Sequence, residues 1–207
     1  LSRQILATLV ANDLVNRMGP AFVKRVQADT GATLVHPYAD PAVMAGQGTA
    51  ALELLHSDGP FDVLVVPVGG GGLASGTARA LQFASPQTRL VLAEPAGADD
   101  TARSLAAGER QGAFTPDTIC DGLRTLIGAP NFALLRAAGV EVIVVDDAAT
   151  MAAMRLLWEV LKQVVEPSSA TVLAAVLAQP QRFAGLRVGL VLSGGNVDLP
   201  ALRWGAP

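Results

Sequence analysis

The sequence predicts an α/β fold, in which an open and mostly parallel sheet lies between layers of helices. Three features lead to this prediction. The expected strands are short, β-branched and apolar on both faces, helix-compatible stretches separate most of them, and two of them end in glycine-rich polar segments. Strands with two apolar faces are typical of a parallel sheet that helices cover on both sides. Such sheets bind ligands at the carboxyl ends of their strands.

The elements alternate regularly after about residue 30. Short β-branched runs predict strands at 32–35, 63–68, 89–94, 141–145 and 187–192. Apolar periodicity predicts helices at 47–55, 73–83, 101–107, 131–138 and 170–178, and a long helix that Asp146 or Asp147 caps and that ends near Val165.

The first segment, 1–28, has a different pattern. Its apolar residues recur at roughly three-to-four spacing, which predicts helix with a break near Gly19-Pro20. The composition changes near Asp29–Gly31, and this is the one candidate boundary. We therefore expect a helical segment at 1–29 and an α/β domain at 30–207.

Composition excludes several classes of protein. The 207 residues are 51% hydrophobic, which is ample for a buried core, but the longest apolar run, Ala170 to Ala178, is about half of a membrane span. A net charge of −3 without a basic cluster argues against nucleic acid as a partner. The single Cys120 excludes an internal disulfide and fits a reducing compartment, and no secretory signal is evident. We expect a cytoplasmic protein that does not enter a membrane.

Four consecutive glycines, Gly69 to Gly72, join the strand that ends at Val68 to the helix that begins at Leu73. Glycine can adopt positive φ and lets a ligand approach the backbone closely. Bare amides at the positive end of a helix dipole bind phosphate. The loop lacks the lysine and hydroxyl of a P-loop and the third glycine of a dinucleotide fingerprint, so a cofactor with one phosphate and an aromatic ring fits better. The alternative is a tight turn without a ligand.

A second polar segment, Ser193-Gly194-Gly195-Asn196, follows the last expected strand. Its serine hydroxyl can donate to, or accept from, a ring nitrogen that is held above the sheet. Asp121-Gly122 can place bare backbone against a flat ligand. Both segments can also be plain turns. Ser168 or Ser169, after Glu166-Pro167, is expected to be the N-cap of the next helix.

Three oxygens near another strand end suggest a cation site. Glu94 ends its strand, Asp100 follows six residues later, and the Ala98 carbonyl lies between them. Hard cations such as Mg²⁺ and Ca²⁺ prefer oxygen ligands of these kinds. The alternative is a solvated acidic loop. The two histidines, His36 and His56, are too isolated to indicate zinc.

Seven motifs occur in one order between about residues 30 and 199. They are His36-Pro37-Tyr38, Ala45-Gly46-Gln47-Gly48-Thr49, Pro67 to Leu73, Glu94-Pro95 with Ala98-Asp99-Asp100, Asp121-Gly122, Glu166-Pro167, and Ser193 to Asp198. Together they resemble the serine racemase and threonine/serine dehydratase family, which comprises pyridoxal-phosphate enzymes of fold type II.

This resemblance implies a role for each candidate residue. Gly69, Gly70, Gly71 and Gly72, with the Leu73 amide, resemble the loop that binds the phosphate of pyridoxal 5′-phosphate. Ser193 resembles the residue that bonds the pyridine nitrogen, and its neutral hydroxyl favours β-elimination or racemisation. Gly122 would lie beside the ring. Glu94, Ala98 and Asp100 resemble a site for Mg²⁺ or Ca²⁺. The family also implies an amino-acid substrate and a homodimer.

The chain departs from the family in one respect. The family forms a Schiff base through a lysine in an N-terminal Ser-x-Lys motif, and that motif is absent here, as is the substrate-carboxylate loop. The two lysines, Lys24 and Lys162, lie in other contexts. We therefore assign no catalytic residue. We expect the C-terminal part of an ammonia-lyase or racemase that converts L-serine or L-threonine in the complete enzyme, and a chain that is inactive alone.

Two alternatives remain open at this point. One is a non-catalytic module that binds a phosphorylated ligand. The other is a fragment of a glutamate dehydrogenase, because the segment from Ala11 to Phe22 resembles a helical stretch of the large NAD-dependent enzymes of that kind. A fusion, a truncation or a faulty gene model joined near Thr30 would explain both the missing lysine and this stretch.

Overall fold

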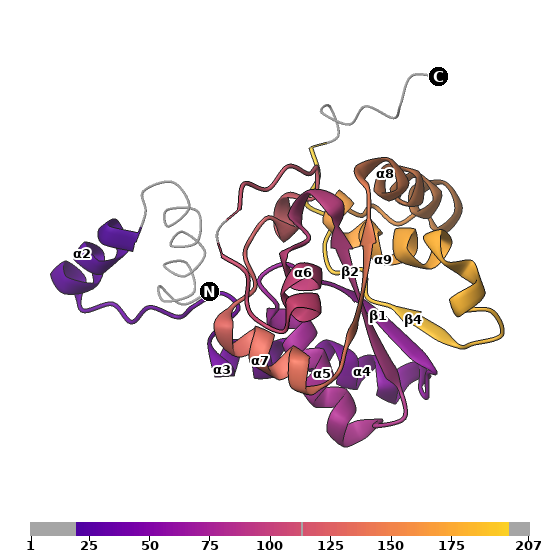
Figure 1. The fold of residues 1–207 in the computed structure, drawn as a ribbon, viewed down its shortest axis with the longest axis horizontal. Coiled ribbons are helices and arrows are strands. Elements are labelled where there is room, and N and C mark those ends of the chain that lie inside the picture. Colours follow the sequence, from indigo (N-terminus) through magenta and orange to yellow (C-terminus); the bar gives the residue numbers. More distant parts are fainter. Residues whose placement is uncertain (1–19, 113, 199–207) are drawn as a thin grey trace.

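A four-stranded parallel sheet forms the centre of the molecule (Figure 1). The computed structural model describes residues 20–112 and 114–198. The strands are β1 (Val63–Pro67), β2 (Arg89–Pro95), β3 (Glu141–Val145) and β4 (Val188–Leu190), in the spatial order β3-β2-β1-β4. All neighbouring pairs are parallel. The predicted α/β fold with an open parallel sheet is confirmed.

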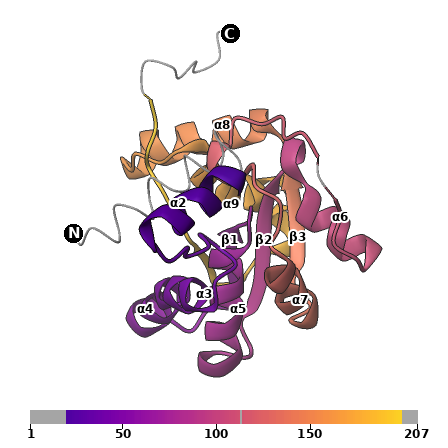
Figure 2. The same ribbon diagram turned by 90° about the vertical axis from the view of Figure 1, so that its left-hand side faces the viewer.

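Helices cover both faces of this sheet (Figures 1 and 2). One face packs against α4 (Thr49–Asp58), α5 (Gly72–Ala84) and α7 (Ala129–Ala137), and the other against α9 (Pro167–Ala178) and α8 (Asp147–Leu156). Successive residues of β1 alternate between the two cores: Leu64 and Val66 belong to the first, and Val63 and Val65 to the second. Because both faces are buried, the strand is apolar throughout.

The strand order creates a switch point beside β1. The chain proceeds from β1 to β2 and β3 on one side, and then returns to add β4 on the other side of β1. The helices between β1 and β3 lie on one face, and those between β3 and β4 lie on the other (Figure 2). Ligands of open α/β sheets bind at such a point, outside the carboxyl ends of the strands. The segments after β1 and β4 both lie there.

One expectation near the start of the α/β domain is wrong, and the bounds of another differ slightly. The residues expected to form a strand at 32–35 pair with no described strand, and β structure requires a hydrogen-bonded neighbour. The helix expected at 47–55 is α4, which begins at Thr49 and extends to Asp58, and a helix that was not expected, α3 (Pro41–Gln47), precedes it with Gly48 between them. The carboxylate of Asp40 starts α3 by accepting a hydrogen bond from the Ala42 amide at 2.7 Å.

The helix before this region, α2 (Pro20–Thr30), begins at the expected break and ends before Gly31, whose φ is +68°. It lies apart from the helical layers of the sheet (Figure 1). The expected helix over residues 1–19 lies outside the described residues. The division into segments 1–29 and 30–207 stays a prediction.

The long helix after β3 is shorter than expected. The Asp146 carboxylate caps α8 by accepting a hydrogen bond from the Ala149 amide at 2.7 Å. A π-helical turn, Leu157–Leu161, follows α8, and the backbone then leaves the helix at Lys162, whose φ is +58°. Trp158 packs against the small core beneath this turn, and its Nε1 donates to the Val165 carbonyl at 3.0 Å. The expected helix up to Val165 therefore ends about one turn early.

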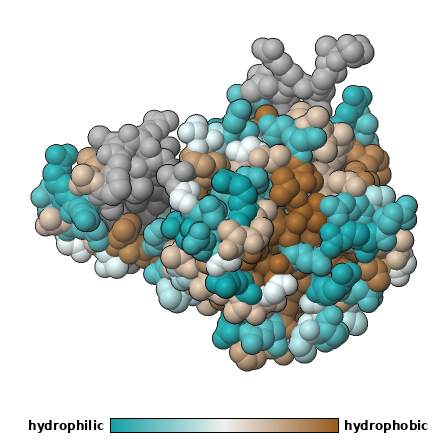
Figure 3. Space-filling model, in the orientation of Figure 1, coloured by the Kyte–Doolittle hydropathy of each residue, from teal (hydrophilic) through white to brown (hydrophobic). Residues whose placement is uncertain are grey.

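Figure 3 shows an apolar stripe in the middle of one face, where Figure 1 has the edge strand β3. Val144 of this strand is 41% exposed. Only β2 pairs with β3 among the described strands. Among the described helices, none is long and apolar enough to span a membrane.

Close contact between α5 and the α3–α4 junction gives a first prediction. A Cβ on Gly76 would collide with the Met44 carbonyl oxygen and lie 2.5 Å from the Gly48 nitrogen. We expect Gly76→Ala to lower the free energy of unfolding by about 1–3 kcal/mol, because both obstacles are backbone atoms. Urea denaturation measures this change.

Gly46→Ala is the matched control. Gly46 lies in α3, and a Cβ there would meet nothing within 4 Å. Alanine is the better helix former, so this variant should gain up to about 1 kcal/mol. Equal effects of the two variants would contradict the close contact.

Candidate functional site

The glycine loop forms a nest of backbone amides at the start of α5. Gly69 to Gly72 are all buried, and Gly71 adopts a φ of +91° as the N-cap of this thirteen-residue helix. None of the amides from Gly69 to Leu73 donates a hydrogen bond to any described residue. Buried amides are nearly always paired, so an acceptor is missing. An anion at the helix N-terminus would supply it.

Three segments enclose the loop so closely that side chains cannot fit. A Cβ on Gly69 would lie 2.9 Å from the Leu123 Cα, and one on Gly71 would lie 2.8 Å from the Asn131 Cβ. A Cβ on Gly70 would enter the ring of Tyr38. The glycines therefore serve two purposes, because they expose amides and also admit these neighbours.

Sequence reasoning missed the roles of Tyr38 and Asn131. The Tyr38 ring packs on the glycine loop, and burial raises the pKa of its hydroxyl. The buried Asn131 amide nitrogen donates to the Tyr38 carbonyl at 2.9 Å and to the Ser75 hydroxyl at 3.1 Å. The sequence did draw attention to Tyr38, because this residue ends the His36-Pro37-Tyr38 motif. It gave no such indication for Asn131.

Ser193 lies at the same edge of the sheet as the glycine loop. β1 and β4 run parallel, with Val65 opposite Leu190, and the Val191 amide donates to the Val65 carbonyl at 3.1 Å. The segments after both strands therefore emerge side by side. Ser193 itself is exposed. A position on the opposite edge would have excluded a shared ligand.

Gly122 lies between these two segments. Its neighbour Leu123 contacts Gly69, and its own Cα faces the Ser168 hydroxyl and the Glu166 carboxylate. Glu166 in turn lies against Gly194, whose Cβ would be 2.7 Å from its Oε1. The glycine loop, Gly122 and the Ser193 segment thus form one continuous surface.

The expected capping role of Ser168 and Ser169 is wrong. The N-cap of α9 is Glu166, whose side chain makes no capping bond, and Pro167 opens the helix. Both serine hydroxyls instead accept hydrogen bonds from distant backbone, Ser168 from Gly122 at 3.1 Å and Ser169 from Gly194 at 3.0 Å. Burial raises the pKa of the Glu166 carboxyl, and Asp121 adds to the rise, while a hydrogen bond from the Asn196 amide opposes it.

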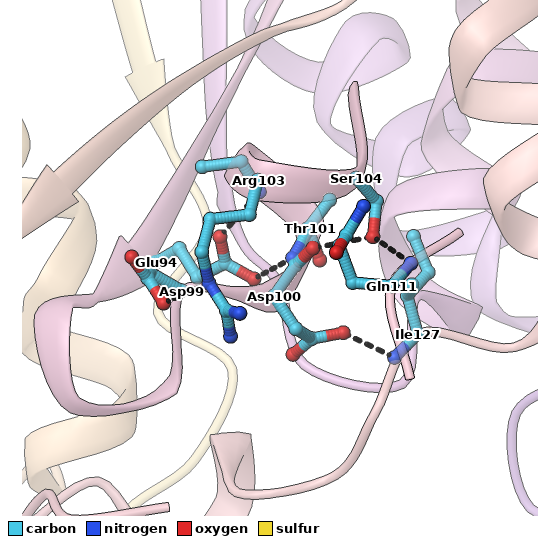
Figure 4. A network of polar contacts seen from close by, with 9 residues as sticks. Glu94, Asp99, Asp100, Thr101, Arg103, Ser104, Gln111 and Ile127 are labelled. Atoms are coloured by element: carbon cyan, nitrogen blue, oxygen red, sulfur yellow. Dashed lines mark hydrogen bonds and ion pairs between the residues drawn. The ribbon is translucent and has the colours of Figure 1, made fainter. Parts of the chain in front are cut away.

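Two residues of the expected cation site, Glu94 and Asp100, lie in a network around the start of α6 (Asp100–Ala107; Figure 4). Glu94 accepts hydrogen bonds from the amides of Thr101 at 2.9 Å and Ala102 at 2.8 Å. Asp100 Oδ2 accepts from the Ile127 amide at 2.8 Å. Asp100 Oδ1 has no partner, although the residue is completely buried.

Burial disfavours the charged forms of both carboxyls in this network. Burial raises the pKa of Glu94 to about 7 and also raises that of Asp100, against the lowering effect of their backbone hydrogen bonds. Two buried carboxyls and an orphaned oxygen are costly without a counter-charge. Ala98 ends the short 3₁₀ turn between them, Ala96–Ala98. Within 20–112 and 114–198, no group of three or more His, Cys, Asp or Glu side chains could hold a metal, so the Ala98 carbonyl would have to be a ligand.

The two lysines lie elsewhere. Lys24 is exposed on α2, and the exposed Lys162 donates to the Glu159 carbonyl at 2.6 Å at the end of the π-helical turn. Cys120 is buried, and burial raises the pKa of its thiol to about 12. We identify no nucleophile among these three side chains.

Comparison with known proteins agrees with this geometry. The profile of the pyridoxal-phosphate dependent enzyme family matches residues 9–194. The chain belongs to this family. It is 45% identical over 180 residues to a β-hydroxyaspartate dehydratase of Paracoccus denitrificans (strain Pd 1222), an alignment that covers 87% of the chain and 57% of that protein.

Two solved structures extend the comparison to three dimensions. Maize serine racemase matches with a TM-score of 0.83 and 44% identity, over 87% of this chain and 58% of that one. The T.th. threonine deaminase matches with a TM-score of 0.79 and 44% identity, over 84% and 65%. The family and fold that the motifs suggested are confirmed. The chain spans less than two thirds of the length of these relatives.

The family match also extends beyond the expected boundary. It begins at residue 9 and so includes most of the segment at 1–29 that composition set apart. The segment from Ala11 to Phe22 that suggested a glutamate dehydrogenase therefore lies entirely inside the matched region.

Proposed function

We propose that this chain provides the cofactor-binding part of a pyridoxal 5′-phosphate enzyme that acts on a small hydroxy amino acid. The reaction in the complete enzyme is either elimination of water from L-serine or L-threonine, which yields a 2-oxo acid and ammonia, or racemisation of serine. Family membership supports the cofactor class. The relatives named above act as dehydratase, racemase and deaminase, which supports the reaction class.

The observation that carries the proposal is the set of buried amides without an acceptor. From Gly69 to Leu73 they surround the N-terminus of α5, and a phosphate monoester would satisfy several of them at once. No lysine or arginine is needed, because the helix dipole and the amides supply the positive potential.

The ring would lie between Gly122 and Ser193. Gly122 offers backbone without a side chain, and the Ser193 hydroxyl would bond the pyridine nitrogen. When bound, the cofactor withdraws electrons from the substrate α-carbon, which is the chemistry that both elimination and racemisation require. A neutral hydroxyl partner does not protonate the ring nitrogen, and this favours those two outcomes.

A probe that cannot form a Schiff base tests this site in the chain as it stands. Pyridoxine 5′-phosphate has an alcohol in place of the aldehyde, so surface lysines cannot capture it. We expect it to bind more tightly than pyridoxine, which lacks the phosphate, in a titration followed by calorimetry. We expect Gly71→Ala to weaken it at least about tenfold, because alanine is strained at φ +91° and would displace Asn131.

Gly139→Ala is the matched control. Gly139 also has a positive φ, +63°, but a Cβ there meets nothing within 4 Å. The Gly139→Ala variant should have a lower free energy of unfolding but an unchanged affinity for pyridoxine 5′-phosphate. Preferential binding of a nucleotide over pyridoxine 5′-phosphate would instead support the non-catalytic phosphate-binding module.

The chain is proposed to bind the cofactor without turning over substrate. Neither Lys24 nor Lys162 lies in a Ser-x-Lys context, so no side chain is assigned to hold the cofactor covalently or to move the α-proton. Incubation with pyridoxal 5′-phosphate and L-serine should give no pyruvate in a coupled assay with lactate dehydrogenase. Steady turnover that Lys162→Ala or Lys24→Ala abolishes would show that a lysine was wrongly excluded.

We also propose that Glu94, the Ala98 carbonyl and Asp100 bind Mg²⁺ or Ca²⁺. The orphaned Asp100 Oδ1 supports this. A cation at roughly 100 times its Kd should stabilise the fold by about 2.7 kcal/mol, seen as a rise in Tm. Asp100→Asn should abolish the rise.

Asp99→Asn is the control for that experiment. Asp99 is the neighbouring acid, and its ion pair with Arg103 is largely exposed, with 2.7 Å between the charged atoms. This variant should retain the cation-dependent rise in Tm. The proposed cation site would be excluded if the cation raised the Tm of Asp100→Asn as much as that of the unaltered chain, or if it did not raise the Tm of the unaltered chain. A homodimer of the complete enzyme stays a prediction.

A further inference from the structure

Three side chains at the start of α9 reach across to both segments that flank the proposed ring position. We call Glu166, Ser168 and Ser169 the α9 brace. Each accepts a hydrogen bond from a backbone amide that is distant in sequence, and none caps its own helix with its side chain.

Ser168 contacts the first segment. Its hydroxyl oxygen lies 3.1 Å from the Gly122 nitrogen, 46 residues away in the chain, and the residue is 2% exposed. The Gly122 amide also reaches the carboxylate of its neighbour Asp121, at 2.9 Å. A Cβ on Gly122 would lie 3.0 Å from the Ser168 hydroxyl oxygen, so this backbone rests directly on the serine.

Ser169 and Glu166 contact the second segment at three points. The Gly194 amide donates to the Ser169 hydroxyl at 3.0 Å, and the Asn196 amide donates to Glu166 Oε2 at 2.9 Å. The Glu166 amide donates to the Gly194 carbonyl at 3.1 Å. β4 ends at Leu190, so sheet pairing no longer fixes the backbone at Ser193. These three hydrogen bonds hold the backbone beyond the end of the β4 pairing.

Burial increases the contribution of these hydrogen bonds to stability. Ser168 and Ser169 are almost completely buried, and a buried hydroxyl costs free energy unless it is hydrogen-bonded. Serines in a first helical turn commonly bond their own helix. Here their acceptor capacity serves the backbone of two other segments, at Gly122 and Gly194.

We propose that the α9 brace is a positioning device, which holds Gly122 and Ser193 at a fixed separation on either side of the cofactor ring. The proposal rests on the proposed function for the identity of the ring. One rigid helix contacts both segments, so the space between them is set by the structure of the first turn of α9. Glu166, Ser168 and Ser169 are positioning residues in this scheme.

Amide hydrogen exchange in the free chain tests the brace without any ligand. In Ser169→Ala, the Gly194 amide should exchange at least about tenfold faster while the Gly122 amide is unchanged. In Ser168→Ala the pattern should reverse. Thr171→Val is the matched control, because this buried hydroxyl on the same helix donates within the helix, to the Ser168 carbonyl at 2.8 Å. It should accelerate neither amide selectively.

Ligand binding gives a second readout. Ser169→Ala should weaken pyridoxine 5′-phosphate about fivefold and leave the affinity for inorganic phosphate within about twofold, because the amide loop after β1 is untouched. A merely structural role would weaken both ligands alike. Where Ser169→Ala does not fold, Glu166→Ala tests the same segment through exchange of the Asn196 amide, since Glu166 is only half-buried.

The two proposals fail in different ways. Unchanged exchange of Gly194 in Ser169→Ala and of Gly122 in Ser168→Ala would overturn the brace. Selective exchange together with no binding of pyridoxine 5′-phosphate to the unaltered chain would leave the brace standing and overturn the proposed function.

Discussion

The central position of β1 is the constraint on which the rest of the structure depends. This strand pairs with β2 on one side and with β4 on the other, and its two faces pack against different helical layers. Because the pairs are parallel, every strand delivers its carboxyl end to one edge. The segments after β1 and β4 therefore lie next to each other, although more than 100 residues separate Gly72 from Ser193.

Buried polar groups that lack a hydrogen bond lower the stability of a fold. The amides from Gly69 to Leu73 and the buried Asp100 Oδ1 have no hydrogen-bond partner in the part of the chain that the structure describes. Elsewhere the same interior forms hydrogen bonds across long distances, as the Asn131 amide nitrogen does with Tyr38 and Ser75. A ligand that formed hydrogen bonds with these groups would remove the free-energy cost of leaving them unpaired, and this gain would contribute to its affinity.

Local patterns predicted most of the fold. The strands at β1, β2 and β3 and the helices α5, α6 and α7 agree with expectation to within about two residues, because apolar runs and capping residues act over short range. The failures have non-local causes. Residues 32–35 have the composition of a strand but pair with no described strand, and the junction of α3 and α4 is glycine where the Gly76 backbone lies against it.

The sequence by itself determined the chemistry that this chain can offer: bare glycine amides before a helix, a hydroxyl after a strand, and paired acids. These follow from residue types and spacing, whereas the family was indicated by the resemblance of seven motifs and confirmed by the family match. Only the tertiary structure decided which of them meet. The role of the α9 serines, the Tyr38 ring on Gly70 and the orphaned oxygen of Asp100 all depend on contacts between segments far apart in the chain. A single sequence carries no local signal for such contacts, because packing of the whole sheet and its helices fixes them.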